Sequence, residues 1–206
     1  MNRTPRHSKR WATGYTGKGY TIVELMLALA LLTVGSAGII TMQRVTAQSN
    51  RHAKQLSIGT HIAQAWIDEL VADSSQWRTS GDFTGTNWLN QHGTVGWFRP
   101  AYSDVRRWGA AFDIGGNPQQ TASNSTVFCS DLRLTWLYNE VGAGAQGSGL
   151  LRAEVRVYWQ RTPVAELAIP LGPHPCNWSA LDISGPEGAK AHHFVFLSTA
   201  LLQHDQ

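Results

Sequence analysis

The feature that most constrains this chain is an apolar segment near its N-terminus. Tyr20–Met42 reads YTIVELMLALALLTVGSAGIITM and holds a single charged side chain, that of Glu24, in 23 residues. As a helix that rises about 1.5 Å per residue, the segment is long enough to cross a bilayer core of about 30 Å. Ala, Leu and Met favour a helix, whereas Gly35 and Gly38 weaken it locally. We therefore predict the transmembrane half of a helix over residues 20–42.

A cleaved secretory signal is the first alternative for this segment. Such a signal would need a small-residue cleavage site after the apolar run, and Ser36-Ala37-Gly38 loosely fits that description. A glutamate inside the apolar core is a poor feature for a signal of this kind. On this alternative the mature protein would begin near residue 39.

Positive charge is concentrated before the apolar segment. Residues 1–19 carry no acidic side chain, while the rest of the chain has 12 basic and 14 acidic residues, so the formal charge of +3 belongs to the N-terminal tip. This step in charge predicts a cytoplasmic, positively charged flank before a membrane segment. It also removes the main support for a nucleic-acid-binding surface. The basic residues of the tip are Arg3, Arg6, Lys9, Arg10 and Lys18.

Beyond Met42 the chain turns polar but keeps a helical pattern. Apolar residues recur at four-residue spacing and form one stripe on a helix, and residues 43–73 contain no proline and only one glycine, Gly59. We predict one helix from about Tyr20 to Asp73, roughly 80 Å long, whose second half, 43–73, is amphipathic. The stripe consists of Ile58, Ile62, Trp66 and Leu70, with Ala65 beside it.

Residues 74–206 are expected to form a globular head. Its first part, 74–128, is rich in Gly, Ser, Thr and Asn, which predicts a loop-rich region with short strands at most, one of them around 95–98. From residue 131 apolar and polar residues alternate. This period predicts two strands at 131–139 and 152–159, joined through a Gly-rich turn at 142–149. A third strand at 193–201, apolar on both faces, and a short fourth strand at 164–169 complete the predicted antiparallel sheet within 131–201. The apolar face of the sheet needs a cover, and the stripe on the helix is the candidate, so the predicted fold class is α+β.

A short motif at the start of the apolar run resembles the type IV prepilin signature. The resemblance implies that a prepilin peptidase cuts between Gly19 and Tyr20 on the cytoplasmic face, removes the leader 1–19, and leaves Tyr20 to be N-methylated. It also implies that Glu24, the fifth mature residue, pairs with the N-terminus of a neighbouring subunit during assembly. The family usually begins with Phe, and Tyr20 keeps an aromatic ring. The motif reads Lys18-Gly19-Tyr20-Thr21-Ile22-Val23-Glu24.

The physical properties of these residues fit the implied roles. Gly19 has no side chain, so its backbone can enter a protease cleft closely. A cut before the apolar segment keeps that segment in the mature protein, unlike an ordinary signal peptide. The carboxylate of Glu24 costs several kcal/mol in a bilayer unless it is paired. A chance glutamate near a membrane interface is the alternative reading of Glu24.

Within the pilin-like family the chain is most similar to minor pilins of the PilV kind and to the I subunit of type II secretion. The similarity rests on Ala63–Leu70, Val155–Trp159 and Phe194–Leu201. Major pilins often carry a helix-kinking proline where this chain has Thr41. We therefore expect a minor type IV pilin, with a type II secretion pseudopilin as the alternative. The choice between these two filaments stays open.

The resemblance also implies a location and a set of partners. A single-pass protein in the bacterial inner membrane, with its head in the periplasm, would later enter a pilus or pseudopilus. Its expected partners are the prepilin peptidase/methyltransferase, other pilin or pseudopilin subunits, the inner-membrane assembly platform, and membrane lipid before assembly. No cofactor and no nucleic acid is expected.

The two cysteines, Cys129 and Cys176, lie far apart and form no CxxC pair, so they do not indicate a metal site. In an oxidising compartment a single disulfide is their natural pairing. The resemblance supports it, because many pilin heads have two late cysteines that close a C-terminal loop. Two buried free thiols are the alternative.

Catalytic motifs are lacking in the sequence. It contains no GxSxG, HExxH or GxxxxGK[ST] pattern, so we expect no enzyme. His192 and His193 are adjacent on a predicted strand and point to opposite faces, which disfavours a shared metal ion. A membrane-tethered enzyme and a secreted binding module remain as rival hypotheses. Four tryptophans of the loop-rich region serve either packing or the binding of sugar or another pilin: Trp77, Trp88, Trp97 and Trp108.

Overall fold

The structure is a computed structural model of the 206-residue chain. It describes residues 19–77, 83–91, 96–138, 149–161, 174–177, 179 and 182–203. The basic leader before Gly19, most of the predicted turn at 142–149 and the predicted strand at 164–169 lie outside the described residues. The chain divides into two compact units, with the boundary between Ser49 and Asn50.

One helix, α1, spans Ile22–Ser74, close to the predicted bounds. Its residues up to Ser49 belong to the first unit, and the remainder is part of the second unit, the head. At its C-terminal end the buried carboxylate of Asp73 accepts hydrogen bonds from the backbone N–H groups of Asn87, Trp88 and Leu89. These bonds tie the end of α1 to the short 3-10 helix η1, Leu89–Gln91.

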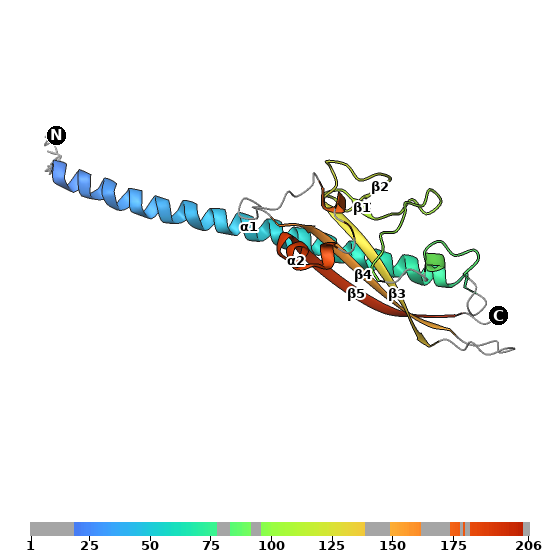
Figure 1. Cartoon of the computed structure of the whole chain (residues 1–206). Helices are drawn as coiled ribbons and strands as arrows, with labels where there is room; N and C mark the ends of the chain where they lie inside the picture. The colour runs from blue at the N-terminus through green and yellow to red at the C-terminus, as the bar shows by residue number, and fades with distance from the viewer. Residues whose placement is uncertain are drawn as a thin grey trace, which may run out of the picture. The chain divides into compact units, whose positions relative to one another are not determined.

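The head contains one antiparallel sheet in the order β2-β1-β3-β4-β5 (Figure 1). The three long strands are those predicted from the sequence, two from the alternation and the third from an apolar run, and each is a little longer than expected. The α+β arrangement of a long apolar helix and a small antiparallel sheet is therefore confirmed. The strands are β1 (Ala111–Phe112), β2 (Pro118–Gln119), β3 (Phe128–Tyr138), β4 (Leu150–Gln160) and β5 (His192–Leu202).

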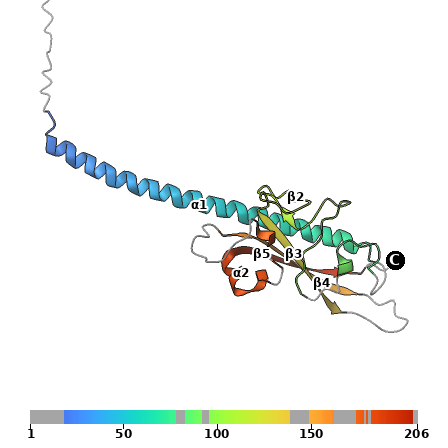
Figure 2. The same cartoon turned by 45° about the horizontal axis from the view of Figure 1, so that its top comes forward.

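The head residues of α1 cover one face of the sheet and form the core with it (Figure 2). Ile62, Trp66 and Leu70 are buried, as the stripe predicted, against Leu132 of β3 and Val155 of β4. Each apolar side chain buried in this way contributes about 1.5–3 kcal/mol.

Gly59 marks the closest approach between α1 and the sheet. A Cβ atom at this position would lie 2.9 Å from Cζ3 of Trp159, which is fully buried on β4. A contact this short is not sterically possible without movement of the indole ring. The one glycine in the amphipathic half of the helix is therefore required by packing.

The loop-rich region contributes to the core more than its composition suggested. Trp77 and Trp88 are buried, and Trp108 packs against the same cluster, which favours the packing interpretation for these three residues. The strand expected around 95–98 reduces, in the described part, to a single bridge between Phe98 and Leu132.

The second face of the sheet is partly covered by elements that no sequence pattern predicted. These are the 3-10 helices η2 (Pro175–Asn177) and η3 (Asp182–Ser184) and the short helix α2 (Pro186–Ala191). Under this cover lie two charged side chains, Asp131 of β3 and Arg156 of β4, both buried. We call this second face of the sheet, which points away from α1, the outer face.

Candidate functional site

The residues that carry the prepilin-like motif form the capped start of α1. Gly19, Tyr20 and Thr21 are not helical, and the helix begins at Ile22. The hydroxyl oxygen of Thr21 accepts a hydrogen bond from the backbone N–H of Glu24 at 3.3 Å, and its carbonyl accepts the N–H of Leu25 at 3.2 Å. Thr21 is thus the N-cap, and Thr-x-x-Glu is the spacing of a capping box. The helix starts two residues later than predicted because this cap precedes it.

Gly19 has no packing role in the chain. A Cβ atom added there would meet no other atom within 4 Å, and the backbone does not lie in the left-handed region that favours glycine. Within the described residues, the fold therefore tolerates a side chain at this position. The described residues therefore give no packing reason for a glycine at this position.

The first unit presents an apolar surface without a cover of its own. Large apolar side chains from Ile22 to Val45 are exposed, and by length and composition α1 can cross a membrane. The hydroxyl groups in this stretch are satisfied locally: Thr33 donates to the carbonyl of Ala30 at 2.8 Å and Thr41 to that of Ala37 at 3.0 Å. Such bonds lower the cost of placing a hydroxyl in lipid.

Glu24 is the exception in this otherwise apolar stretch. It is the only acidic or basic residue between Tyr20 and Met42, and it lies in the first turn of α1. A carboxylate in that turn interacts favourably with the positive end of the helix dipole. This interaction offsets only part of the several kcal/mol that an ionised carboxylate costs in lipid. The site is therefore suited to a cationic partner such as an ammonium group.

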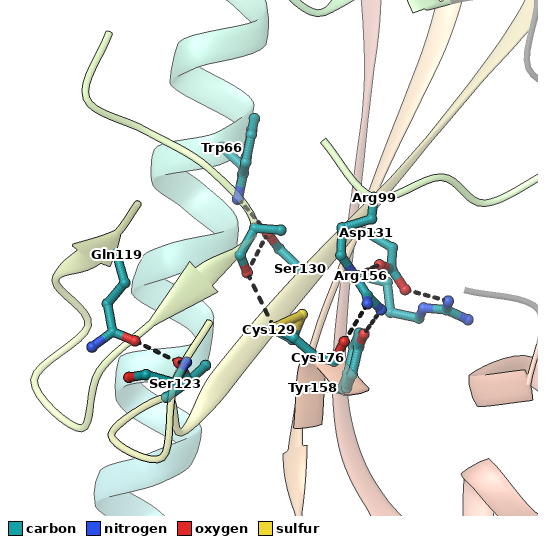
Figure 3. The surroundings of a disulfide bond; sticks show 12 residues. Trp66, Arg99, Gln119, Ser123, Cys129, Ser130, Asp131, Arg156, Tyr158 and Cys176 are labelled. Carbon is teal, nitrogen blue, oxygen red and sulfur yellow. Dashed lines mark hydrogen bonds and ion pairs between the residues drawn. A yellow bond between two sulfur atoms is a disulfide. The ribbon is translucent and has the colours of Figure 1, made fainter. Parts of the chain in front are cut away.

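In the head, Cys129 of β3 and Cys176 of η2 form a disulfide, the pairing expected from the sequence (Figure 3). Their Cα atoms are 5.4 Å apart, within the range of native disulfides. The bond attaches η2 to the outer face of the sheet.

Beside the disulfide, two arginines converge on one carboxylate (Figure 3). Asp131 accepts a hydrogen bond from Nη2 of Arg156 at 2.6 Å and from Nε of Arg99 at 3.2 Å. Arg99 also donates to the hydroxyl of Tyr158 and, at 2.6 Å, to the backbone carbonyl of Cys176. We call these four side chains, Arg99, Asp131, Arg156 and Tyr158, the Asp131 cluster. Burial, followed by the negative charge of Asp131, raises the pKa of the Tyr158 hydroxyl.

The Asp131 cluster has the properties of a structural anchor. Arg156 donates at 2.7 Å to the hydroxyl of Ser184 in η3, so the cluster holds η3 as well as η2 against the sheet. The ring of Trp97 lies over Arg156, with 4.5 Å between its centroid and Cζ. Sequence reasoning missed this cluster, because the alternation places Asp131 and Arg156 on the polar face of the sheet, away from the apolar positions that form the core.

The two adjacent histidines lie on opposite faces of β5, as the alternation predicted. His192 packs beside Tyr158 on the outer face, and His193 contacts His52 of α1 on the other face, with 4.6 Å between ring centroids. Burial lowers the pKa of both β5 histidines. Among the described residues, no three His, Cys, Asp or Glu side chains are grouped as a metal site requires.

No family model, no curated protein and no solved structure matches this chain.

Proposed function

We propose that this chain is the precursor of a type IV pilin-like subunit, a minor pilin that joins or primes a filament assembled at the inner membrane. The observation that carries the proposal is the start of α1. A glycine without a packing role is followed by an aromatic residue, a threonine cap and a lone glutamate, directly before an exposed apolar helix. Each of these properties has a purpose in a subunit that is cut after Gly19 and then packs its helix against other subunits.

The two compact units support the same proposal. The first unit has an exposed apolar surface, and the hydroxyl groups of Thr33, Ser36 and Thr41 in it bond to the backbone of the same helix. This suits a segment that is first surrounded by lipid and later by other helices. The head has a disulfide, which suits an oxidising space such as the periplasm. A type II secretion pseudopilin has the same requirements and is the alternative subtype.

N-terminal mass spectrometry of the membrane-extracted protein separates the rival functional classes. The proposal requires a mature protein that begins at Tyr20 and carries a methylated amine. A secreted binding module would begin near residue 39, after the apolar run. A tethered enzyme would keep the leader. Either of the last two N-termini would refute the proposal.

Substitution at Gly19 tests the cleavage directly. We expect Gly19→Leu to accumulate as an uncut precursor, because the new side chain obstructs the protease and not the fold. Gly38→Leu is a matched control, since a side chain at Gly38 also meets nothing within 4 Å of the chain. The control should be cut normally. Normal maturation of Gly19→Leu would show that the junction is not the processing site.

Substitution at Glu24 tests the assembly role. Glu24→Val should be inserted and cut, since the new side chain is better solvated by lipid, but should be incorporated into filaments poorly. Thr21→Val is the control for simple helix fraying. It removes the cap, at a cost of about 1 kcal/mol, and leaves the carboxylate in place, so it should still assemble. Efficient assembly of Glu24→Val would rule out pairing of Glu24 with a neighbouring subunit.

A further inference from the structure

The two edges of the head sheet differ sharply. One edge is β2, which has two residues, one of them Pro118. The other edge is β5, which has 11 residues and pairs with β4 without a bulge along its whole length (Figure 1). β5 contains no Asp, Glu, Lys, Arg or Pro. In the described part of the chain, no strand borders its free side.

Soluble proteins normally protect such edges. Short length, proline, bulges and charged side chains all prevent an edge strand from pairing with another chain, and β2 uses the first two of these. β5 uses none of them. Two of its apolar side chains on the outer face, Phe196 and Leu202, are more than half exposed. A long, neutral and regular edge of this kind is suited to the addition of another strand.

Charge next to this edge indicates what kind of strand it would accept. On the outer face, Ala200 of β5 lies opposite Arg152 of β4, whose side chain is half exposed. Because Ala200 is small, the long arginine side chain can reach across it to the next strand position. Arg152 shares Glu154 with Arg133, at 2.9 and 2.6 Å, so this group of three has a net positive charge. The hydrogen bond from Arg133 keeps the pKa of Glu154 below its usual value and the carboxylate ionised.

We propose that the free edge of β5 is a docking site for an extended strand of a partner protein, which carries a carboxylate opposite Ala200 and apolar side chains beside Phe196. Backbone hydrogen bonds to β5 supply affinity, and the pairing of the carboxylate with Arg152 fixes the register. This site lies in the head and goes beyond the proposed function, because it does not depend on how the N-terminus is processed.

The same charges argue against a second copy of this chain as the occupant. A second β5 has no carboxylate to offer, and it would bring its own Arg152 toward the same outer face. Self-pairing would therefore leave positive charge at the seam without a partner. An acidic strand removes that charge imbalance.

Synthetic peptides provide the test. Fluorescein-labelled peptides of the same length as β5, with alternating Thr and Val and a central Glu, Gln or Lys, are titrated with the full-length protein in detergent micelles, and anisotropy is measured at low salt. We expect the Glu peptide to bind about fivefold more tightly than the Lys peptide, with the Gln peptide between them. A Glu peptide N-methylated at consecutive backbone positions, which blocks both of its edges, should not bind.

Two variants test whether the preference for the Glu peptide over the Lys peptide arises at the free edge of β5. Arg152→Gln should abolish the difference between the Glu and Lys peptides. Arg133→Gln is the matched control, since it removes one charge from the same group but one strand further from the edge, and it should preserve the difference. Cooperative urea unfolding with the midpoint of the parent protein, followed by the fluorescence of the buried tryptophans, shows that both variants fold.

The proposal is overturned if no peptide binds, if the three peptides bind equally, or if the N-methylated peptide binds as well as its parent. It is also overturned if cross-linking reveals homodimers that the Glu peptide dissociates, because a second copy would then be the occupant of the edge. An uncut or unassembled pilin precursor would affect none of these readouts.

Discussion

Substitution of Asp131 by Asn is expected to destabilise the head strongly. Asp131 is fully buried and is the only carboxylate within the Asp131 cluster. The substitution keeps the shape of the side chain but removes the negative charge that two arginines share. Arg156 is only 2% exposed, so its guanidinium would lose the charge of Asp131 in a buried position. Loss of one partner from a buried pair typically costs about 3–5 kcal/mol.

The sheet itself provides a matched control for this prediction. Glu154 also binds two arginines on the outer face, but these are 38% and 50% exposed, and water can solvate them once the carboxylate is lost. Glu154→Gln should therefore cost about 1 kcal/mol or less, in the range of surface ion pairs. The two variants remove the same charge from the same face and differ mainly in the burial of the arginines left behind.

Urea unfolding of the full-length protein in detergent micelles, followed by tryptophan fluorescence, measures both changes. Several tryptophans are fully buried in the head, so the signal reports on the core. A loss of about 3–5 kcal/mol is a large share of the 5–15 kcal/mol typical of a domain, so Asn at position 131 should shift the midpoint strongly. Equal losses in the free energy of unfolding for the two variants would refute this prediction, since burial would then not determine how much each ion pair contributes to stability.

Three further predictions concern the same unfolding measurement. Replacement of both Cys129 and Cys176 by Ser should lower the free energy of unfolding by about 4 kcal/mol, as the chain-entropy model predicts for the loop that this disulfide closes. An unchanged urea midpoint would contradict this prediction. Gly59→Ala should destabilise the head by about 1–3 kcal/mol because the new methyl group meets a buried indole ring, whereas Gly38→Ala should have no such cost. Burial and nearby positive charge lower the pKa of His193 in the folded protein. Near the usual histidine pKa of about 6.5, this side chain is therefore more protonated in the unfolded chain than in the folded protein. The free energy of unfolding should fall as the pH drops from 7 to 5, and His193→Gln should make this dependence on pH weaker.

The layers of the head could be predicted because the patterns that encode them are local. Alternation along residues 131–159 places Leu132 and Val155 on one face, and the four-residue spacing of Ile62, Trp66 and Leu70 supplies the matching stripe. The stripe is contained in a few turns of one helix, and the alternation is contained in one hairpin. The structure confirms both, and the contact between them follows since no other apolar stripe was available.

The start of α1 could be located because the motif that marks it is also local, although the capping bond of Thr21 was not predicted. The sequence pointed to Gly19, Tyr20 and Glu24 as a processing and assembly motif. The additional role of Thr21 as N-cap was visible in principle, since a threonine three residues before a glutamate is a capping-box spacing. That cap also leaves Gly19 and Tyr20 outside the helix.

The Asp131 cluster could not be predicted because it joins segments that no local pattern connects. Arg99 comes from the loop-rich region, and Asp131 and Arg156 come from two strands. The backbone carbonyl of Cys176, which accepts a hydrogen bond from Arg99, belongs to η2, an element that was not predicted. Alternation alone assigns Asp131 and Arg156 to a solvated face. The disulfide attaches η2 to that face, and η2, η3 and Trp97 together cover the pair. On the same face the side chain of Arg152 is half exposed, whereas that of Asp131 is fully buried.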